Sequence, residues 1–167
     1  MKTQEIKFAQ VKSAFAMTCR VETEIHARAE EIWGLLTDAK HFSSWNSTVS
    51  SIEGDIREGE RIHIHVPGTN RIFRPTVSGV AANKSMTWSN GIPLIFRGTR
   101  TFELLSCTNG CTKFIMEEHF SGILFALIKN KLPDFKPIFE RFAHDLKKAS
   151  EWSNTKSAAA LELKVRL

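Results

Sequence analysis

The chain has 167 residues, of which 42% are hydrophobic and 25% are charged, and its formal net charge is +5. This length and composition predict one globular domain with a substantial core and exclude a disordered chain. The longest apolar run, from Ile123 to Ile128, is far shorter than the roughly 20 residues of a membrane-spanning helix. The residues up to Ala16 are interrupted by charges and lack the apolar centre of a signal peptide. We therefore expect a soluble, cytoplasmic protein.

The cysteine count and the charge distribution argue against two further classes. Three cysteines without a secretion signal do not fit a disulfide framework. The basic residues are scattered, and part of their excess lies in the tail after Lys156, where Ser157 to Glu162 looks like linker sequence from a cloning vector. We therefore expect no nucleic-acid partner. We divide the chain into an N-terminal arm (1–16), one domain (17–152) and a C-terminal tail (153–167). The arm is either a loose segment or an extra edge strand.

The first half of the domain predicts one strand, two helices and then several short strands. Apolar and polar residues alternate from Met17 to Ile25, which is typical of a strand with one buried face. Helical spacing then predicts a helix from Ala29 to about Thr37 and a second, short helix from Asp38 to Trp45, capped by Asp38. Further strands are expected at 49–54, 62–66, 73–80 and 85–90, and Pro75 indicates an edge or a bulge in the third of these.

A hairpin from Leu94 to Phe120 is the most informative stretch. Its even-numbered side chains are mostly apolar and its odd-numbered ones polar, so we expect the even-numbered face, Leu94 included, to point inward. The loop Thr108-Asn109-Gly110 fits a type I turn followed by a glycine in the left-handed conformation. That turn sets Arg100 opposite Glu118.

A long closing helix is predicted by apolar residues at helical spacing. This stripe comprises Phe135, Ile138, Phe139, Phe142, Ala143, Leu146 and Ala149. Pro133 and Pro137 interrupt its start, so we expect the helix to begin near Pro133. We expect Leu124 to Leu132 to form a separate turn or a helical lid. The sequence leaves open whether the break near Pro133 gates the interior.

The pair Arg100 and Glu118 has two interpretations. It is either a cross-strand ion pair at the rim of the sheet or part of the wall of a cavity, because dry core would impose a large desolvation penalty on both ions. In a cavity, Arg100 would bind a polar group of a largely apolar guest while Glu118 holds the guanidinium in place. The expected ligand-binding residues are Trp88, Phe96, Arg100, Phe102, Glu118, Phe120, Phe135, Phe139 and Phe142.

Other reactive residues do not form a recognisable motif. We find no nucleophile with a base, no phosphate-binding loop and no metal-ligand spacing. His63 and His65 share a strand face and are expected on the surface. Cys107, Cys111 and His119 lack a fourth zinc ligand. We therefore expect no metal and no organic cofactor.

The order of these features resembles the START-like (SRPBCC) superfamily, in particular its polyketide cyclase/dehydrase and lipid-transport-like branch. The resemblance lies in Val21 to Asn46, Met86 to Leu104 and Glu117 to Leu124, followed by the closing helix to about Trp152. It implies an α+β helix-grip fold, in which a seven-stranded curved antiparallel sheet surrounds a long C-terminal helix, with two short helices between the first two strands. It also implies a hydrophobic cavity between sheet and helix. Relatives often carry histidine where Arg100 stands, which weakens the case for histidine-assisted cyclisation.

Three functions follow, in order of preference. The first is binding or transport of a small hydrophobic molecule, such as a lipid or a polyketide, anchored by Arg100. The second is a cyclase or dehydratase in which Arg100 stabilises an enolate and Glu118 acts as base. The third is a protein or RNA partner role that uses basic residues of the closing helix, namely Lys136, Arg141, Lys147 and Lys148. The sequence leaves open whether the chain forms a homodimer.

Overall fold

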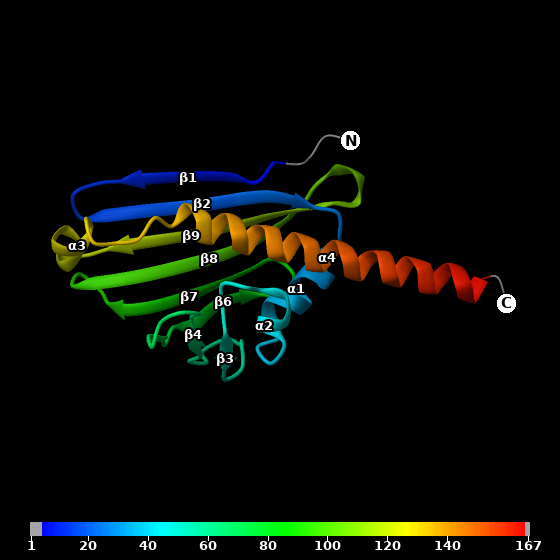
Figure 1. Cartoon of the computed structure of the whole chain (residues 1–167), viewed down its shortest axis with the longest axis horizontal. Coiled ribbons are helices and arrows are strands. Elements are labelled where there is room, and N and C mark those ends of the chain that lie inside the picture. Colours follow the sequence, from blue (N-terminus) through cyan, green and yellow to red (C-terminus); the bar gives the residue numbers. More distant parts are fainter. Residues whose placement is uncertain (1–4, 166–167) are drawn as a thin grey trace.

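The computed structural model describes the backbone of residues 5–165 and the side chains up to Thr155, apart from those of Asn109 and Asn154. Its main layers are a curved antiparallel sheet and one long helix, α4, that lies across the concave face of the sheet (Figure 1). The strands are β1 Lys7–Lys12, β2 Ala16–Ile25, β3 Ser51–Glu53, β4 His63–His65, β5 Ile72–Phe73, β6 Thr76–Ala81, β7 Ser85–Ile92, β8 Phe96–Ser106 and β9 Thr112–Ser121. The helices are α1 Ala29–Thr37, α2 Phe42–Trp45, α3 Ile123–Ile128 and α4 Lys136–Val165, with a single 3-10 turn, η1, at Thr108–Gly110.

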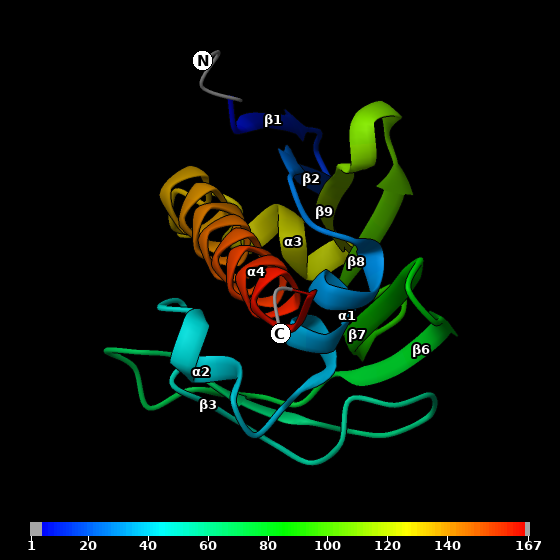
Figure 2. The same cartoon turned by 90° about the vertical axis from the view of Figure 1, so that its right-hand side faces the viewer.

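The α+β helix-grip architecture is confirmed, with a different division of the strands. The described strands form a six-stranded sheet in the order β1-β2-β9-β8-β7-β6 and a separate three-stranded sheet in the order β3-β4-β5. The expected strand over 73–80 is split at Pro75, which has no N–H to donate to a strand ladder. The carbonyl of Pro75 accepts a hydrogen bond from the N–H of Ile62 at 3.0 Å, so the two sheets stay joined at this point. Figure 2 looks nearly along α4 and shows the strands curving around it.

The described part of the N-terminal arm contains an edge strand, β1. β1 pairs with β2 in antiparallel register from Lys7 opposite Glu22 to Lys12 opposite Met17. Phe8 turns its ring edge-on to Phe139 of α4, with 5.9 Å between the ring centroids. The arm therefore closes one side of the space between the sheet and α4.

The two short helices lie between β2 and β3, as expected. α1 has the predicted bounds, whereas α2 begins only at Phe42. Asp38 does not cap α2. Its carboxylate instead accepts hydrogen bonds from the backbone N–H of His41, at 3.2 Å, and pairs with the His41 ring, at 2.8 Å.

The register of the central hairpin is confirmed. Phe102 lies opposite Met116, Leu104 opposite Phe114 and Arg100 opposite Glu118. The connecting turn ends at Gly110 with a φ of +71°, the left-handed conformation that favours glycine. Leu94 differs from expectation: it lies in the turn between β7 and β8, where the alternation of faces does not apply, and points into solvent.

α4 differs from the predicted helix at both ends. It begins at Lys136, whose N–H is capped by the Asp134 carboxylate at 3.0 Å, so Pro137 lies in the first turn, where a missing N–H is harmless. The helix extends to Val165, past the expected end near Trp152. The preceding segment contains a separate helix, α3, which ends at Ile128, before the expected end at Leu132.

The core lies between the sheet and α4. Phe139, Phe142, Ala143 and Leu146 of the predicted stripe are buried, but Ile138, in the first turn of α4, is 42% exposed. Phe139, the next residue in the same turn, is fully buried, so Ile138 lies at the margin of the stripe, on a side of α4 that faces solvent. Within the described residues, no helix combines the length and apolar character needed to span a bilayer.

Candidate functional site

Arg100 and Glu118 lie in a row of four side chains that crosses the sheet. Cys19 of β2 is opposite Glu118 of β9, which is opposite Arg100 of β8, which is opposite Trp88 of β7. Directly opposed residues of neighbouring strands point to the same face. The guanidinium of Arg100 lies 5.5 Å from the ring centroid of Phe139 on α4. The row therefore faces the helix, on the concave side of the sheet.

The ion pair is tight and only partly buried. Arg100 donates from Nε at 3.1 Å and from Nη2 at 2.5 Å, both to Oε2 of Glu118. The side chains are 24% and 15% exposed, so the pair is not enclosed in dry core. Among the described residues, neither side chain has another hydrogen-bond partner. The remaining guanidinium N–H groups and Oε1 of Glu118 are therefore available to a bound molecule.

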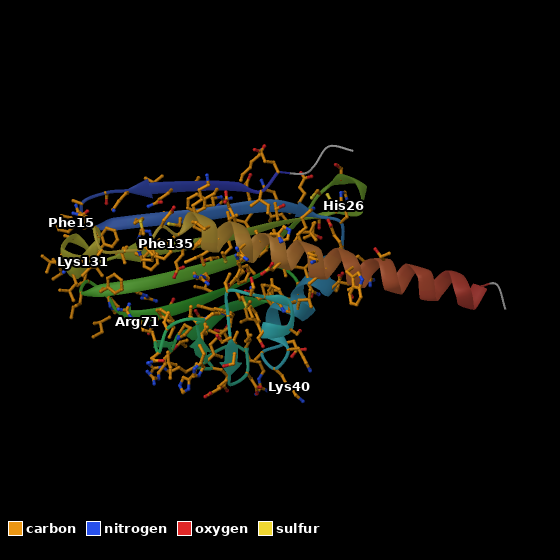
Figure 3. The ribbon with its side chains drawn as sticks, in the orientation of Figure 1. Phe15, His26, Lys40, Arg71, Lys131 and Phe135 are labelled. Carbon is orange, nitrogen blue, oxygen red and sulfur yellow. The ribbon has the colours of Figure 1, made fainter. Side chains whose placement is uncertain are left out.

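Three half-buried phenyl rings pack on one another beside the pair. Phe96 stacks on Phe120 with 6.3 Å between centroids, and Phe120 packs against Phe135 at 5.1 Å. Phe135 lies just before α4 begins (Figure 3) and meets Phe139 edge-on. We call the set Phe96, Gly98, Arg100, Glu118, Phe120 and Phe135 the Arg100 site.

Gly98 keeps one position of the inner face without a side chain. It lies opposite Phe120 and one inward-facing position before Arg100 on β8. A Cβ placed there would lie 3.5 Å from the Phe120 ring and 3.8 Å from Oε1 of Glu118. A larger side chain at Gly98 would therefore occupy the place where a ligand would reach the carboxylate.

A third of the predicted lining is solid core. Trp88, Phe102 and Phe142 are almost fully buried. The Phe142 ring has four aromatic neighbours, with centroid distances of 5.7 to 6.2 Å; they are Phe42, Trp45, Phe102 and Phe114. Of the nine residues expected to bind a ligand, the structure therefore brings five, Phe96, Arg100, Glu118, Phe120 and Phe135, to a partly accessible surface, with Phe139 beneath it.

Two neighbours of the ion pair have unusual polar groups. The indole Nε1 of Trp88 is buried and makes no hydrogen bond within the described part of the chain, which is uncommon for a buried donor. Burial, and next the charge of Glu118, raise the pKa of the Cys19 thiol to about 11. Cys19 therefore stays protonated near neutral pH and is a weak nucleophile.

Several contributors to this region were not predicted. Gly98 is not among the expected ligand-binding residues, although it interrupts the apolar pattern of even-numbered positions in the hairpin. Phe8 belongs to the arm, whose sequence shows no clear period. Leu132 packs against the core between α3 and α4, in a segment for which the sequence predicted only a turn or a lid.

Other candidate residues lie away from the site. His63 and His65 contact the Glu53 carboxylate at 3.7 and 3.1 Å. The three cysteines are free thiols, and no group of three potential metal ligands gathers within the described residues. Two surface hollows of about 560 and 670 Å³ also lie elsewhere, one beside α1 and β3 and one beside the β6–β7 turn and the end of β8. Neither hollow is lined by a predicted ligand-binding residue. The prediction of a ligand-binding site therefore depends on the partly exposed side chains of the Arg100 site.

Solved structures with the same fold come from several bacteria. A protein of unknown function from Staphylococcus aureus shares 16% identity, covers 90% of this chain and 98% of its own, and has a TM-score of 0.64. A START superfamily protein from Mycobacterium smegmatis shares 14% identity over 81% of this chain and 97% of its own, with a TM-score of 0.59. A protein from Mesorhizobium loti shares 22% identity over 79% and 95%, with a TM-score of 0.62. These likenesses show the fold alone.

Sequence comparison assigns the family. No curated protein matches the chain significantly. The family model described as polyketide cyclase / dehydrase and lipid transport matches residues 17–151, from β2 to the part of α4 that packs on the sheet. The chain therefore belongs to the polyketide cyclase / dehydrase and lipid transport family.

Proposed function

We propose that the chain binds a small, mostly apolar molecule with an anionic or carbonyl end at the Arg100 site. The observation that carries this proposal is the partly exposed Arg100–Glu118 pair on the concave face, which has unused hydrogen-bonding groups and a row of half-buried phenyl rings beside it. An isolated, accessible ion pair contributes only about 0–1 kcal/mol to the stability of a fold, so stability alone does not explain a charged pair at this position.

The chemistry divides between the pair and the rings. Arg100 donates to the polar end of the ligand, and Glu118 fixes the orientation of the guanidinium from the opposite side. Phe96, Phe120 and Phe135 cover the apolar body, and each Å² of apolar surface removed from water stabilises the complex by about 25 cal/mol.

Binding fits the site better than catalysis. The family description covers both cyclisation or dehydration and transport. A cyclase or dehydratase would use Glu118 as base, and only Oε1 is free for this role, because Oε2 already accepts two hydrogen bonds from Arg100. The titratable neighbour, Cys19, has a pKa of about 11 and is a poor proton donor near neutrality.

A partner role for the basic residues of α4 has less support. Lys136 lies 3.9 Å from Glu140, and Lys147 lies 2.8 Å from Glu151. These ion pairs offset part of the positive charge that an RNA or an acidic protein would need.

A fluorescent probe with a matching shape tests the proposal. Anilinonaphthalene sulfonate has an apolar body and one anionic end. We expect saturable binding to the native chain, weakened roughly 10- to 100-fold by Arg100→Gln, because a hydrogen bond to a charged group contributes about 1.5–3 kcal/mol. Gly98→Val should block binding while leaving the ion pair intact.

The matched control is the ion pair on the outer face. Arg20 of β2 and Glu117 of β9 also pair across two strands, at 3.2 Å, on the side away from α4. Arg20→Gln should leave probe binding unchanged. Equal losses in Arg20→Gln and Arg100→Gln, or unchanged binding in Gly98→Val, would contradict the proposed site. Turnover of a polyketide substrate that disappears in Glu118→Gln would favour the enzyme instead.

A further inference from the structure

One end of the molecule exposes a continuous group of large apolar side chains. They come from the β1–β2 turn, the β7–β8 turn and α3, which Figures 1 and 3 show side by side at the end opposite the C-terminal half of α4. We call this group the apolar tip: Phe15, Ile92, Leu94, Ile123, Leu124 and Leu127. Leu94 is 84% exposed and Leu127 is 73% exposed. Apolar patches of this kind mark interaction surfaces.

Backbone hydrogen bonds hold the three segments together. Ile123 donates to the carbonyl of Leu94 at 3.0 Å, and Leu124 donates to that of Ile95 at 2.9 Å. Gly122 donates to the carbonyl of Phe15 at 3.1 Å. The apolar side chains therefore project from a backbone that is already ordered, so binding would require little further ordering.

Leu94 is an unfavourable choice for folding at its position. Its φ is +68°, a conformation that a bulky side chain rarely adopts and that glycine or asparagine adopts more easily. Its side chain is exposed, so burial within the chain does not offset this strain. A strained and exposed leucine indicates that the side chain is used for contact with something outside the chain.

The charges around the apolar tip are all positive. The segments 12–16, 91–97 and 121–133 contain Lys12, Arg97, Lys129 and Lys131, and no aspartate or glutamate. Lys12 also donates from Nζ to the carbonyl of Lys129 at 2.9 Å, which links β1 to the end of α3. The nearest carboxylates in sequence are Asp134, which caps α4, and Glu118, which is paired with Arg100.

From this geometry we infer that the apolar tip docks on the surface of an anionic phospholipid bilayer. Leucine, isoleucine and phenylalanine side chains would enter the boundary between headgroups and acyl chains, while the four cations contact lipid phosphates. This combination of an apolar face with lysine and arginine at its margin is the one that lets a protein lie on a membrane without crossing it. The inference does not depend on what the Arg100 site binds.

Vesicle co-sedimentation tests the inference. We expect the full chain to sediment with vesicles of phosphatidylcholine and phosphatidylserine, and to remain in solution with vesicles of phosphatidylcholine alone. Leu94→Ser should weaken binding by at least about tenfold, because one apolar side chain leaves the bilayer interface. Lys131→Ala should weaken it roughly fivefold and reduce its salt dependence.

Controls at the other end of the molecule make the test specific. Leu105→Ser removes an exposed leucine from the far end of β8, and Lys40→Ala removes an exposed lysine from the segment before α2. Both should bind vesicles as the native chain does. Gly98→Val should also bind vesicles normally, which separates this result from a failure of the Arg100 site. In a Leu94→Trp variant, vesicles should shift the emission of the new indole to shorter wavelength.

Three outcomes would overturn the inference. Equal binding to neutral and anionic vesicles would show that the four cations do not contribute to membrane binding. An equal loss of vesicle binding in Leu105→Ser and Leu94→Ser would show that the apolar tip is not the membrane-binding surface. Sedimentation of the free chain as a dimer that Leu94→Ser dissociates, with no vesicle binding, would assign the tip to a second copy of the chain.

Discussion

Truncation to alanine should have different effects at Phe142 and at Phe135. Phe142→Ala should mainly lower stability, whereas Phe135→Ala should mainly weaken ligand binding. The Phe142 ring is 1% exposed and packs among Phe42, Phe102 and Phe114. Removing a phenyl ring from such a site leaves a cavity and lowers the free energy of unfolding by about 3–5 kcal/mol. Phe135 is only half buried, at the Arg100 site, so we expect Phe135→Ala to lose about 1–2 kcal/mol.

Urea unfolding, followed by tryptophan fluorescence, measures the loss in the free energy of unfolding of both variants. Probe titration of the folded variants measures the change in ligand binding. Phe135→Ala should weaken binding of anilinonaphthalene sulfonate. The milder Phe142→Leu, which keeps most of the side-chain volume, should lose about 1 kcal/mol of stability and leave binding unchanged. Equal stability losses in the two alanine variants would contradict this prediction. Weaker probe binding in Phe142→Leu would contradict it too, because the open site would then extend into the core around Phe142.

Two further predictions concern stability. Burial raises the pKa of Asp145, but hydrogen bonds from the hydroxyl and N–H of Ser47, at 2.6 and 2.9 Å, outweigh it and lower the pKa below its ordinary value. The resulting stability should be present above about pH 4 and be lost as the pH falls through the lowered pKa, so urea midpoints of the native chain and of Ser47→Ala should converge in acid. Gly122 has a φ of +125°, and a Cβ there would lie 2.3 Å from the carbonyl oxygen of Ile95, so Gly122→Ala should lose about 3 kcal/mol or more. Gly68→Ala, with a φ of +71° and no atom within 4 Å, should lose only about 1 kcal/mol by the same measurement, and equal losses would contradict this account.

The hairpin register was predictable because two local rules agree. The turn ending at Gly110 fixes which residues are opposed, and the alternation of apolar residues fixes which face is buried. Together they place Arg100 opposite Glu118 and both on the concave face. The same reasoning is wrong for Leu94, because an alternating pattern does not show where a strand ends and a turn begins.

The division between core and site could not be predicted from periodicity. Phe102 and Phe120 both occupy even-numbered positions of the hairpin, yet Phe102 is fully buried and Phe120 is not. The difference depends on where α4 begins relative to the sheet, and this is set by the cap at Asp134, not by the apolar stripe. The split of the expected 73–80 strand likewise follows from Pro75, which the sequence indicated only as an edge or a bulge.

The most direct test of the proposed binding site is an NMR titration, in which ¹H–¹⁵N correlation spectra of the ¹⁵N-labelled chain are followed as anilinonaphthalene sulfonate is added. We expect the signals of the Arg100 Nε–H and of the Gly98 backbone amide to shift together and to saturate at one ligand concentration, while the signal of the Leu105 amide, at the other end of β8, does not move. Saturable shifts that leave Arg100 and Gly98 unchanged and gather elsewhere would contradict the proposed site.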